Sequence, residues 1–208
     1  MRGSVMRRTG IRALALGAAT VIGLVAAGGQ SVGQARGEGQ AAAREMSHAA
    51  AGDHSHRLRK SDIPWSGHGP NPFNAQIKLA DGRRVAMHYM SGKGLYVQDY
   101  SPRAKGWSKP AVIYKTRTDA CQGIGLKAKD GTVAAFGDFA RYCADGEPPM
   151  ESVAAVATGS LTKWDKHLTT NFDGWQKIAV APGGKKVTFS RYSKTLRWTK
   201  AAGFPAAR

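Results

Sequence analysis

Acidic residues, cysteines and catalytic motifs are all scarce in this chain. Of its 208 residues, 14 are Asp or Glu and 31 are Lys or Arg, so the formal net charge is +17. No Gly-x-Ser-x-Gly string follows residue 35, which excludes the nucleophile elbow of an α/β-hydrolase from the region after it. The glycine-rich string at 91–94 lacks the spacing and the following helix of a phosphate-binding loop. Helical spacing of apolar residues is also missing there, which favours an all-β fold.

The N-terminus has the pattern of an export signal. Four arginines precede an apolar-and-small run at 13–27, and no acidic residue occurs before Glu38. A basic flank, a short apolar core and a small-residue exit are typical of a Sec-type signal peptide. The run is too short to cross a bilayer comfortably, which takes ~20 residues. We therefore predict a secreted protein with a signal peptide at 1–35 and no transmembrane segment after cleavage.

Composition also divides the remaining chain. Residues 36–61 are mostly Ala, Gly, Gln, Arg, Ser and His, and such a segment buries too little surface to offset its ordering entropy. We predict a disordered linker at 36–61, one all-β domain at 62–204 and a short tail at 205–208. Without residues 1–35 the charge balance is 27 minus 14, or +13, so the exported chain remains strongly basic.

The only two cysteines are Cys121 and Cys143. An oxidising compartment favours a disulfide between them, which would stabilise the fold by about 3 kcal/mol on the chain-entropy model. Two thiols without a nearby histidine make a poor zinc site. His48, His54 and His56 could bind a transition metal weakly, but they fall in the predicted linker. We predict a structural disulfide, no metal and no cofactor.

A hairpin pattern occurs three times in the folded part. Short apolar strands flank the turns Asp81-Gly82, Asp130-Gly131 and Gly183-Gly184. The glycines at the second position of these turns are 49 and then 53 residues apart. Asp-Gly between apolar runs is the strongest short-range hairpin signal, and this period is close to that of propeller blades. Small and apolar residues occupy both faces of 153–157, as in a strand covered by sheets on both sides. The pattern predicts two to three antiparallel blade-like units; a β-sandwich with similar hairpins is the alternative.

These hairpins, with the tryptophans that follow them, resemble the repeats of secreted bacterial β-propellers, including the sialidase-like class. The resemblance covers about 76–198. The string 101–107 has the serine and the Gly-Trp of a sialidase aspartate box, but it lacks the acid, and 171–175 has an acid and a tryptophan at other intervals. Two and a half units cannot close a ring that takes about four to eight blades. Such a chain would either complete a propeller by self-association or fold as an open stack of sheets.

The resemblance implies glycoside hydrolysis as an alternative activity. That chemistry needs two carboxyl groups facing each other across a cleft. The acidic residues Asp138, Glu147 and Glu151 are the candidates, although acids in a turn-forming string such as 145–149 usually cap the turn or face solvent. A reduced sialidase-like glycosidase is therefore kept as an alternative function.

Basic residues and aromatic rings occur together in several turns. Rings can stack on sugars while cations hold an anionic backbone. The candidate stacking residues are Trp107, Trp164 and Trp175, and the candidate charge contacts are Arg103, Lys105, Lys163 and Lys166. The competing interpretation is that the tryptophans fill the core and the lysines serve solubility. We predict a non-enzymatic protein that binds extracellular carbohydrate or an anionic polymer of the cell envelope, with no dedicated nucleic-acid motif.

Overall fold

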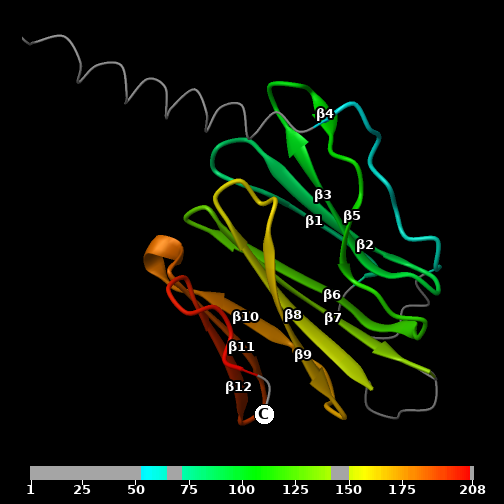
Figure 1. Cartoon of the computed structure of the whole chain (residues 1–208), viewed down its shortest axis with the longest axis vertical. Helices are drawn as coiled ribbons and strands as arrows, with labels where there is room; N and C mark the ends of the chain where they lie inside the picture. Colours follow the sequence, from blue (N-terminus) through cyan, green and yellow to red (C-terminus); the bar gives the residue numbers. More distant parts are fainter. Residues whose placement is uncertain (1–52, 65–71, 142–149, 207–208) are drawn as a thin grey trace, which may run out of the picture. The chain divides into compact units, whose positions relative to one another are not determined.

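The computed structural model describes residues 53–64, 72–141 and 150–206 (Figure 1). These residues form three antiparallel sheets, none of which closes on itself. The predicted signal peptide, Glu147 and Cys143 lie outside the described residues. Within the described ranges no helix has both the length and the apolar character needed to span a membrane. The all-β prediction is confirmed.

Sheet A, the first along the chain, has five strands. They are β1 (Asn74–Lys78), β2 (Arg84–Met90), β3 (Gly94–Ser101), β4 (Gly106–Trp107) and β5 (Ala111–Tyr114). β1, β2 and β3 are sequential neighbours, and β3 then pairs with β5 near its start and with β4 near its end. The β3 edge of this sheet is therefore shared by two short strands.

Sheets B and C follow in chain order. Sheet B contains β6 (Asp119–Lys129), β7 (Thr132–Ala140), β8 (Glu151–Thr158) and β9 (Trp164–Thr170). Sheet C contains β10 (Lys177–Val180), the 3-10 turn η1 (Pro182–Gly184), β11 (Lys186–Arg191) and β12 (Lys194–Thr199). Both are meanders in which each strand pairs with the next. Sheet C has three strands, which matches the shortened third repeat in the sequence.

The three predicted hairpins are β1–β2, β6–β7 and β10–β11, and each turn falls where the sequence places it. Asp130 and Gly131 have φ angles of 49° and 74°. Positive φ at both central residues defines the turn whose twist matches that of the flanking strands, and it explains the Asp-Gly sequence. The hairpin predictions are confirmed.

Sheet B lies between the other two sheets (Figure 1). Side chains alternate along a strand, so β7 and β8 present two faces. Val133 and Val153 belong to the apolar cluster shared with sheet A, whereas Phe136 and Val156 belong to the cluster shared with sheet C. Two cores on opposite faces explain why nearly all of β7 and β8 is buried. The β-sandwich alternative predicts two layers, and the structure has three.

Residues 57–59 cross the face of sheet A that points away from sheet B, and residues 54–56 run along the β4 edge of the sheet. His56 forms an isolated bridge with Trp107, and the Arg59 amide donates to Gln98 Oε1 at 2.7 Å. Gln98 is fully buried as a result. Composition places these residues in a linker, but their main chain supplies the hydrogen bonds that a buried glutamine requires. Residues 53–61, which composition places in the predicted linker, therefore pack on sheet A.

The outer face of sheet C is polar. Its side chains, by strand pairing, are Lys177, Ala179, Lys186, Thr188, Ser190, Thr195, Arg197 and Thr199. No acidic residue occurs anywhere from 174 to 208. A sheet face without large apolar side chains gains little free energy from burial under a further layer. The outer face of sheet C is therefore suited to exposure to solvent.

Candidate functional site

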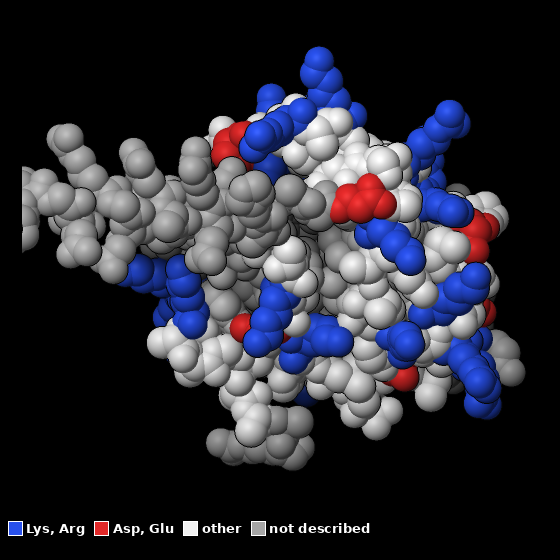
Figure 2. Space-filling view, turned by 45° about the horizontal axis from the view of Figure 1, so that its top comes forward, with Lys and Arg blue, Asp and Glu red and all other residues white. Residues whose placement is uncertain are grey.

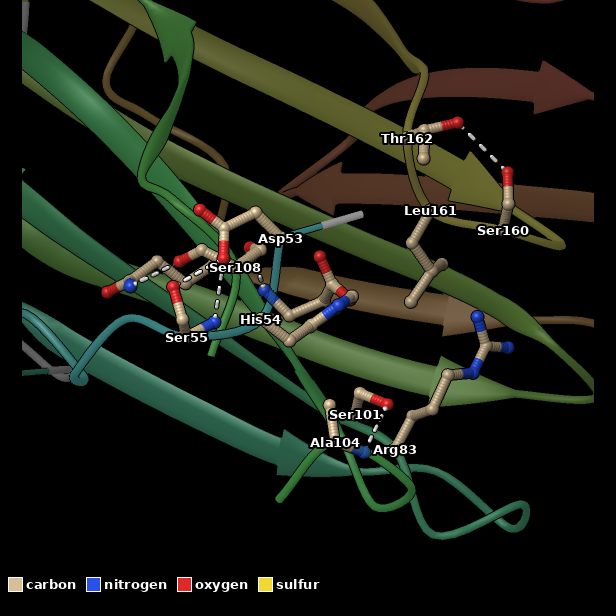
Figure 3. A network of polar contacts seen from close by, with 12 residues as sticks. Asp53, His54, Ser55, Arg83, Ser101, Ala104, Ser108, Ser160, Leu161 and Thr162 are labelled. Atoms are coloured by element: carbon tan, nitrogen blue, oxygen red, sulfur yellow. Dashed lines mark hydrogen bonds and ion pairs between the residues drawn. The ribbon is translucent and has the colours of Figure 1, made fainter. Parts of the chain in front are cut away.

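A pocket of about 440 Å³ opens between sheets A and B. Its walls come from the ends of β2 and β3, from the segment that follows β4, and from the loop between β8 and β9. Four hydroxyl side chains line it: Ser101, Ser108, Ser160 and Thr162. Figure 3 shows residues 160–162 of the β8–β9 loop facing His54, Arg83 and Ser101 across the opening. The pocket combines chain segments that are far apart in sequence.

The floor of the pocket is apolar. Val85, Val97 and Leu161 line it and belong to the core shared by sheets A and B. Leu161 is buried with a φ angle of 64°, a conformation that a bulky residue rarely adopts. This backbone directs its side chain downward between His54 and Arg83 (Figure 3). The strain is therefore located at the pocket and shapes its floor.

Trp164 forms part of the wall at the start of β9. Its indole Nε1 donates to the Leu161 carbonyl oxygen at 3.1 Å. The ring is half-buried, and its one polar group is satisfied inside the protein. A fixed indole with an internal hydrogen-bond partner can offer its ring to a ligand at little cost in side-chain entropy.

Arg83 joins the two turns at the rim of the pocket. Its Nε donates to Asp81 Oδ2 at 2.8 Å, and its Nη1 donates to the Gly159 carbonyl oxygen at 2.8 Å. Asp81 follows β1, and Gly159 follows β8. The hydrogen bond to Arg83 lowers the pKa of Asp81, so this carboxylate stays ionised. The guanidinium thus ties sheet A to sheet B at the mouth of the pocket.

A histidine and a carboxylate meet on another side of the pocket. His54 Nε2 lies 2.7 Å from Asp99 Oδ2, and the imidazole is almost fully buried. The Asp99 amide donates to Ser108 Oγ at 3.0 Å, and the Ser108 amide donates to the Asp99 carbonyl oxygen. This network positions one buried ring, one carboxylate and one hydroxyl within the same wall.

The predicted charge contacts are all exposed, and three of them flank the pocket along the chain. Arg103 and Lys105 lie in the β3–β4 turn just after the pocket residues Ser101 and Pro102. Lys163 lies between the lining residues Thr162 and Trp164. Lys166 is two residues further along β9 and therefore on the Trp164 side of sheet B. None of the four lines the pocket; the charged side chains in its lining, besides His54, are Asp81, Arg83, Asp99 and Lys109.

The two other predicted stacking residues are placed differently. Trp107 is half-buried at the edge of sheet A, with its ring centroid 5.4 Å from that of Tyr100. Trp175 is only 4% exposed and packs with Phe172 and Phe189 in the core between sheets B and C. A buried indole cannot stack on a sugar, so we do not retain Trp175 in the site.

The candidate catalytic acids do not share a cleft. Asp138 belongs to the face of sheet B directed at sheet C, whereas Glu151 is paired with Phe139 on the face directed at sheet A. Asp138 has no exposed surface, and Glu151 Oε2 accepts a hydrogen bond from Thr118 Oγ1 at 3.1 Å. Glu147 lies outside the described residues. Asp138 and Glu151 therefore cannot act as a facing pair.

Asp138 is nevertheless an unusual carboxyl group. Burial raises its pKa to about 7, against the opposing effects of the Ser152 hydroxyl and the Arg191 guanidinium. Ser152 Oγ donates to Oδ1, while Oδ2 has no hydrogen-bond partner among the described residues. Arg191 instead forms an ion pair with Asp173. Ionisation of a buried carboxyl group with one unpaired oxygen lowers the free energy of unfolding. We therefore assign Asp138 an effect on stability and no catalytic role.

Two further predictions concern cysteines and metals. Cys121 is buried in β6, and its proposed partner Cys143 is not among the described residues, so the disulfide stays a prediction. In the parts of the chain that the structure describes, no three His, Cys, Asp or Glu side chains converge as metal ligands. His54 contacts Asp99, and His56 contacts Asp53.

Sequence reasoning missed His54, Arg83 and the hydroxyl loop at 160–162. Composition placed His54 in a linker, and nothing local to it signals a partner 45 residues away. Arg83 follows an Asp-Gly turn, which was a detectable signal for a residue at the end of a sheet. A scan against models of protein families finds no match, and a search of curated proteins finds no relative.

Proposed function

We propose that this protein is a secreted, non-enzymatic binding protein for extracellular carbohydrate or an anionic envelope polymer, with its site in the pocket between sheets A and B. The observation that carries the proposal is the pocket's lining, in which Trp164 and an apolar floor face a set of hydroxyl and charged side chains. The export pattern at 1–35 supports an extracellular ligand.

The lining suits the chemistry of a sugar ring. A pyranose has apolar C–H faces and a periphery of hydroxyl groups, so it needs rings or aliphatic surfaces beside hydrogen-bonding groups. The pocket supplies Trp164 and Leu161 for the first need, and Asp99, Ser160 and Thr162 for the second. The flanking cations favour sugars that carry carboxylate, phosphate or sulfate groups.

The three sheets also support a blade-like interpretation of the repeat. Each sheet begins with a hairpin followed by a third strand, and the first strand of sheet B contacts the first strands of both neighbours. Three units fall short of the number that closes a ring. With residues 57–59 across the outer face of sheet A and a polar outer face on sheet C, the proposed arrangement is an open stack. Completion of a propeller by self-association has less support.

The glycosidase alternative has less support than binding, because Asp138 and Glu151 lie on opposite faces of sheet B. Pairing them across a substrate would require a rearrangement of the middle sheet. Hydrolysis of an aryl glycoside that is abolished by Glu151→Gln, but not by Trp164→Ala, would favour the enzyme.

Retention on insoluble polysaccharides and purified cell wall tests the binding proposal. Residues 36–208 should be retained on at least one glycan at both low and high salt, and Trp164→Ala should weaken that retention about tenfold or more, since an aromatic stacking contact contributes about 1–3 kcal/mol. The matched control is Tyr192→Ala, which removes an aromatic ring that is 82% exposed on the β11–β12 turn. Retention lost in high salt, or equal for both variants, would contradict a specific aromatic site.

A further inference from the structure

A second pocket lies at the other end of sheet A, and three of its six lining residues are cations. Its volume is about 420 Å³ and its lining residues are Gly92, Lys93, Tyr96, Lys115, Thr116 and Arg117. They come from the β2–β3 turn, from β3 and from the segment that follows β5. Its lining contains no carboxylate and no aliphatic side chain, so this pocket differs in chemistry from the one beside Trp164.

Backbone contacts hold the two basic segments together. Gly94 has a φ angle of 108°, and a Cβ atom at this position would lie 2.0 Å from the Tyr114 carbonyl oxygen. Leu95 pairs with Tyr114, and the register shifts immediately afterwards. Only glycine permits this approach. Lys93 and Lys115 are therefore neighbours because the main chain places them so, and their position does not depend on a counter-charge.

The three cations have no acidic partner among the described residues. Lys93, Lys115 and Arg117 are exposed and form no ion pair there. Three acids approach these segments. Asp119 is close along the chain, Glu151 Oε2 accepts from Thr118, and Asp62 Oδ1 accepts from the Ser91 amide of the β2–β3 turn; none of the three lines the pocket. Figure 2 shows Lys and Arg side chains spread over the visible face with only isolated acids among them. Like charges held close together repel each other, and a bound anion would relieve that repulsion.

The hydroxyl groups further define the ligand. Thr118 Oγ1 donates to Glu151 Oε2, so the 2.7 Å contact between Thr116 Oγ1 and Thr118 Oγ1 uses the Thr116 hydrogen. Thr116 therefore has no hydroxyl hydrogen left to donate to a ligand. The lining side chains that still carry donors are those of Lys93, Lys115, Arg117 and Tyr96. Such a set is complementary to a tetrahedral oxyanion.

We propose that this pocket binds a phosphate or sulfate ester group carried by a larger hydrophilic molecule. The pocket volume of about 420 Å³ is more than ten times the roughly 30 Å³ that one water occupies in the liquid. A phosphate or sulfate group would fill only part of it, which leaves room for the adjoining part of the larger molecule. The absence of aliphatic lining excludes a lipid tail as the part that enters. This inference does not rest on the function proposed for the Trp164 pocket.

Titration of residues 36–208 with inorganic phosphate and with inorganic sulfate, at constant ionic strength and followed by amide NMR shifts, tests the proposal. The expected result is a saturable shift of the Lys93 and Thr116 amides. Arg117→Gln and Lys93→Gln, on the two different segments, should each weaken binding about tenfold. The matched controls Arg197→Gln and Lys177→Gln, which remove the same charges from sheet C, should leave it unchanged.

The two arms identify the source of the group, because a phosphate ester and a sulfate ester differ in charge near neutral pH. Tighter phosphate binding indicates a phosphorylated carrier, and equal or tighter sulfate binding indicates a sulfated one. Non-saturating shifts, equal losses in the sheet C controls, or equally tight acetate binding would overturn the proposal. Arg117→Gln should still be retained on the glycan, and Trp164→Ala should still bind phosphate. These two results separate this test from that of the pocket beside Trp164.

Discussion

Replacing Asp138 by asparagine should remove a large part of the pH dependence of stability. The carboxyl group has no exposed surface, and burial raises its pKa from the ordinary 3.8 to about 7. Each pKa unit corresponds to about 1.4 kcal/mol, so the ionised group lowers the free energy of unfolding by on the order of 4 kcal/mol above pH 7. This value is an upper limit, because local relaxation and water entry reduce it.

The sign follows from proton binding. Between pH 3.8 and about 7 the folded protein holds a proton on Asp138 that the unfolded chain has released. Stability therefore falls as pH rises through this window and stays level above it, as far as this group is concerned. Asp138→Asn is neutral throughout, so its stability should not show this fall. An unsatisfied amide donor beside the position of Oδ2 would cost about 1–3 kcal/mol at every pH, which predicts that the two curves cross.

Urea unfolding followed by tryptophan fluorescence between pH 4.5 and pH 8.5 measures the effect. All other ionisable groups are common to both proteins, so the difference between them isolates Asp138. Ser152→Ala supplies a second variant, because loss of the Ser152 hydroxyl, which lowers the Asp138 pKa, should move the fall to higher pH. Equal pH slopes in the wild type and in Asp138→Asn would refute the reasoning.

Three other predictions follow from buried contacts and from the cysteines. Tyr89→Phe should lower the free energy of unfolding by about 1–3 kcal/mol, since the hydroxyl donates to the Gly123 carbonyl oxygen and accepts from the Asp138 amide; unchanged urea midpoints would contradict this. Gly106→Ala should release residues 53–63, because its Cβ would lie 1.7 Å from the His54 carbonyl oxygen, and proteolysis there should accelerate. Gly131→Ala strains a turn residue with a φ angle of 74° but meets no atom within 4 Å, so it should not accelerate cleavage at 53–63. Alkylation without reduction should leave Cys121 and Cys143 unmodified in the secreted protein, and mass spectrometry would detect a free thiol.

The repeat was predictable because its signals are local. Each turn pair, such as Asp130-Gly131, carries a backbone requirement that few residues meet. The run at 153–157 indicated burial on both faces, which the two cores on either side of β8 explain. A strand buried on both faces needs a layer on each side, so this run indicates three layers. The number of sheets also depends on the third hairpin, which forms a separate sheet with β12.

The site was less predictable because its contacts are long-range. Trp164 lies in the pocket wall and Trp107 is half-buried at the edge of sheet A, whereas Trp175, which follows a glycine as Trp107 does, fills the core. Which of two tryptophans is buried depends on the neighbouring sheet and is absent from local sequence. The His54 ring contacts Asp99, and its carbonyl oxygen lies close to Gly106. Both partners are distant in sequence, so the local composition, which predicts a linker, gives no sign of them.

Hydrogen exchange of residues 36–208, with and without a soluble fragment of the retained glycan, tests the central claim most directly. The account predicts slower exchange in the loop at 159–164 and in the segment at 101–109, which together border the pocket between sheets A and B. The loop at 192–193, where Tyr192 is exposed, should be unaffected. Protection confined to sheet C, or equal protection over all basic turns, would contradict a specific site at Trp164.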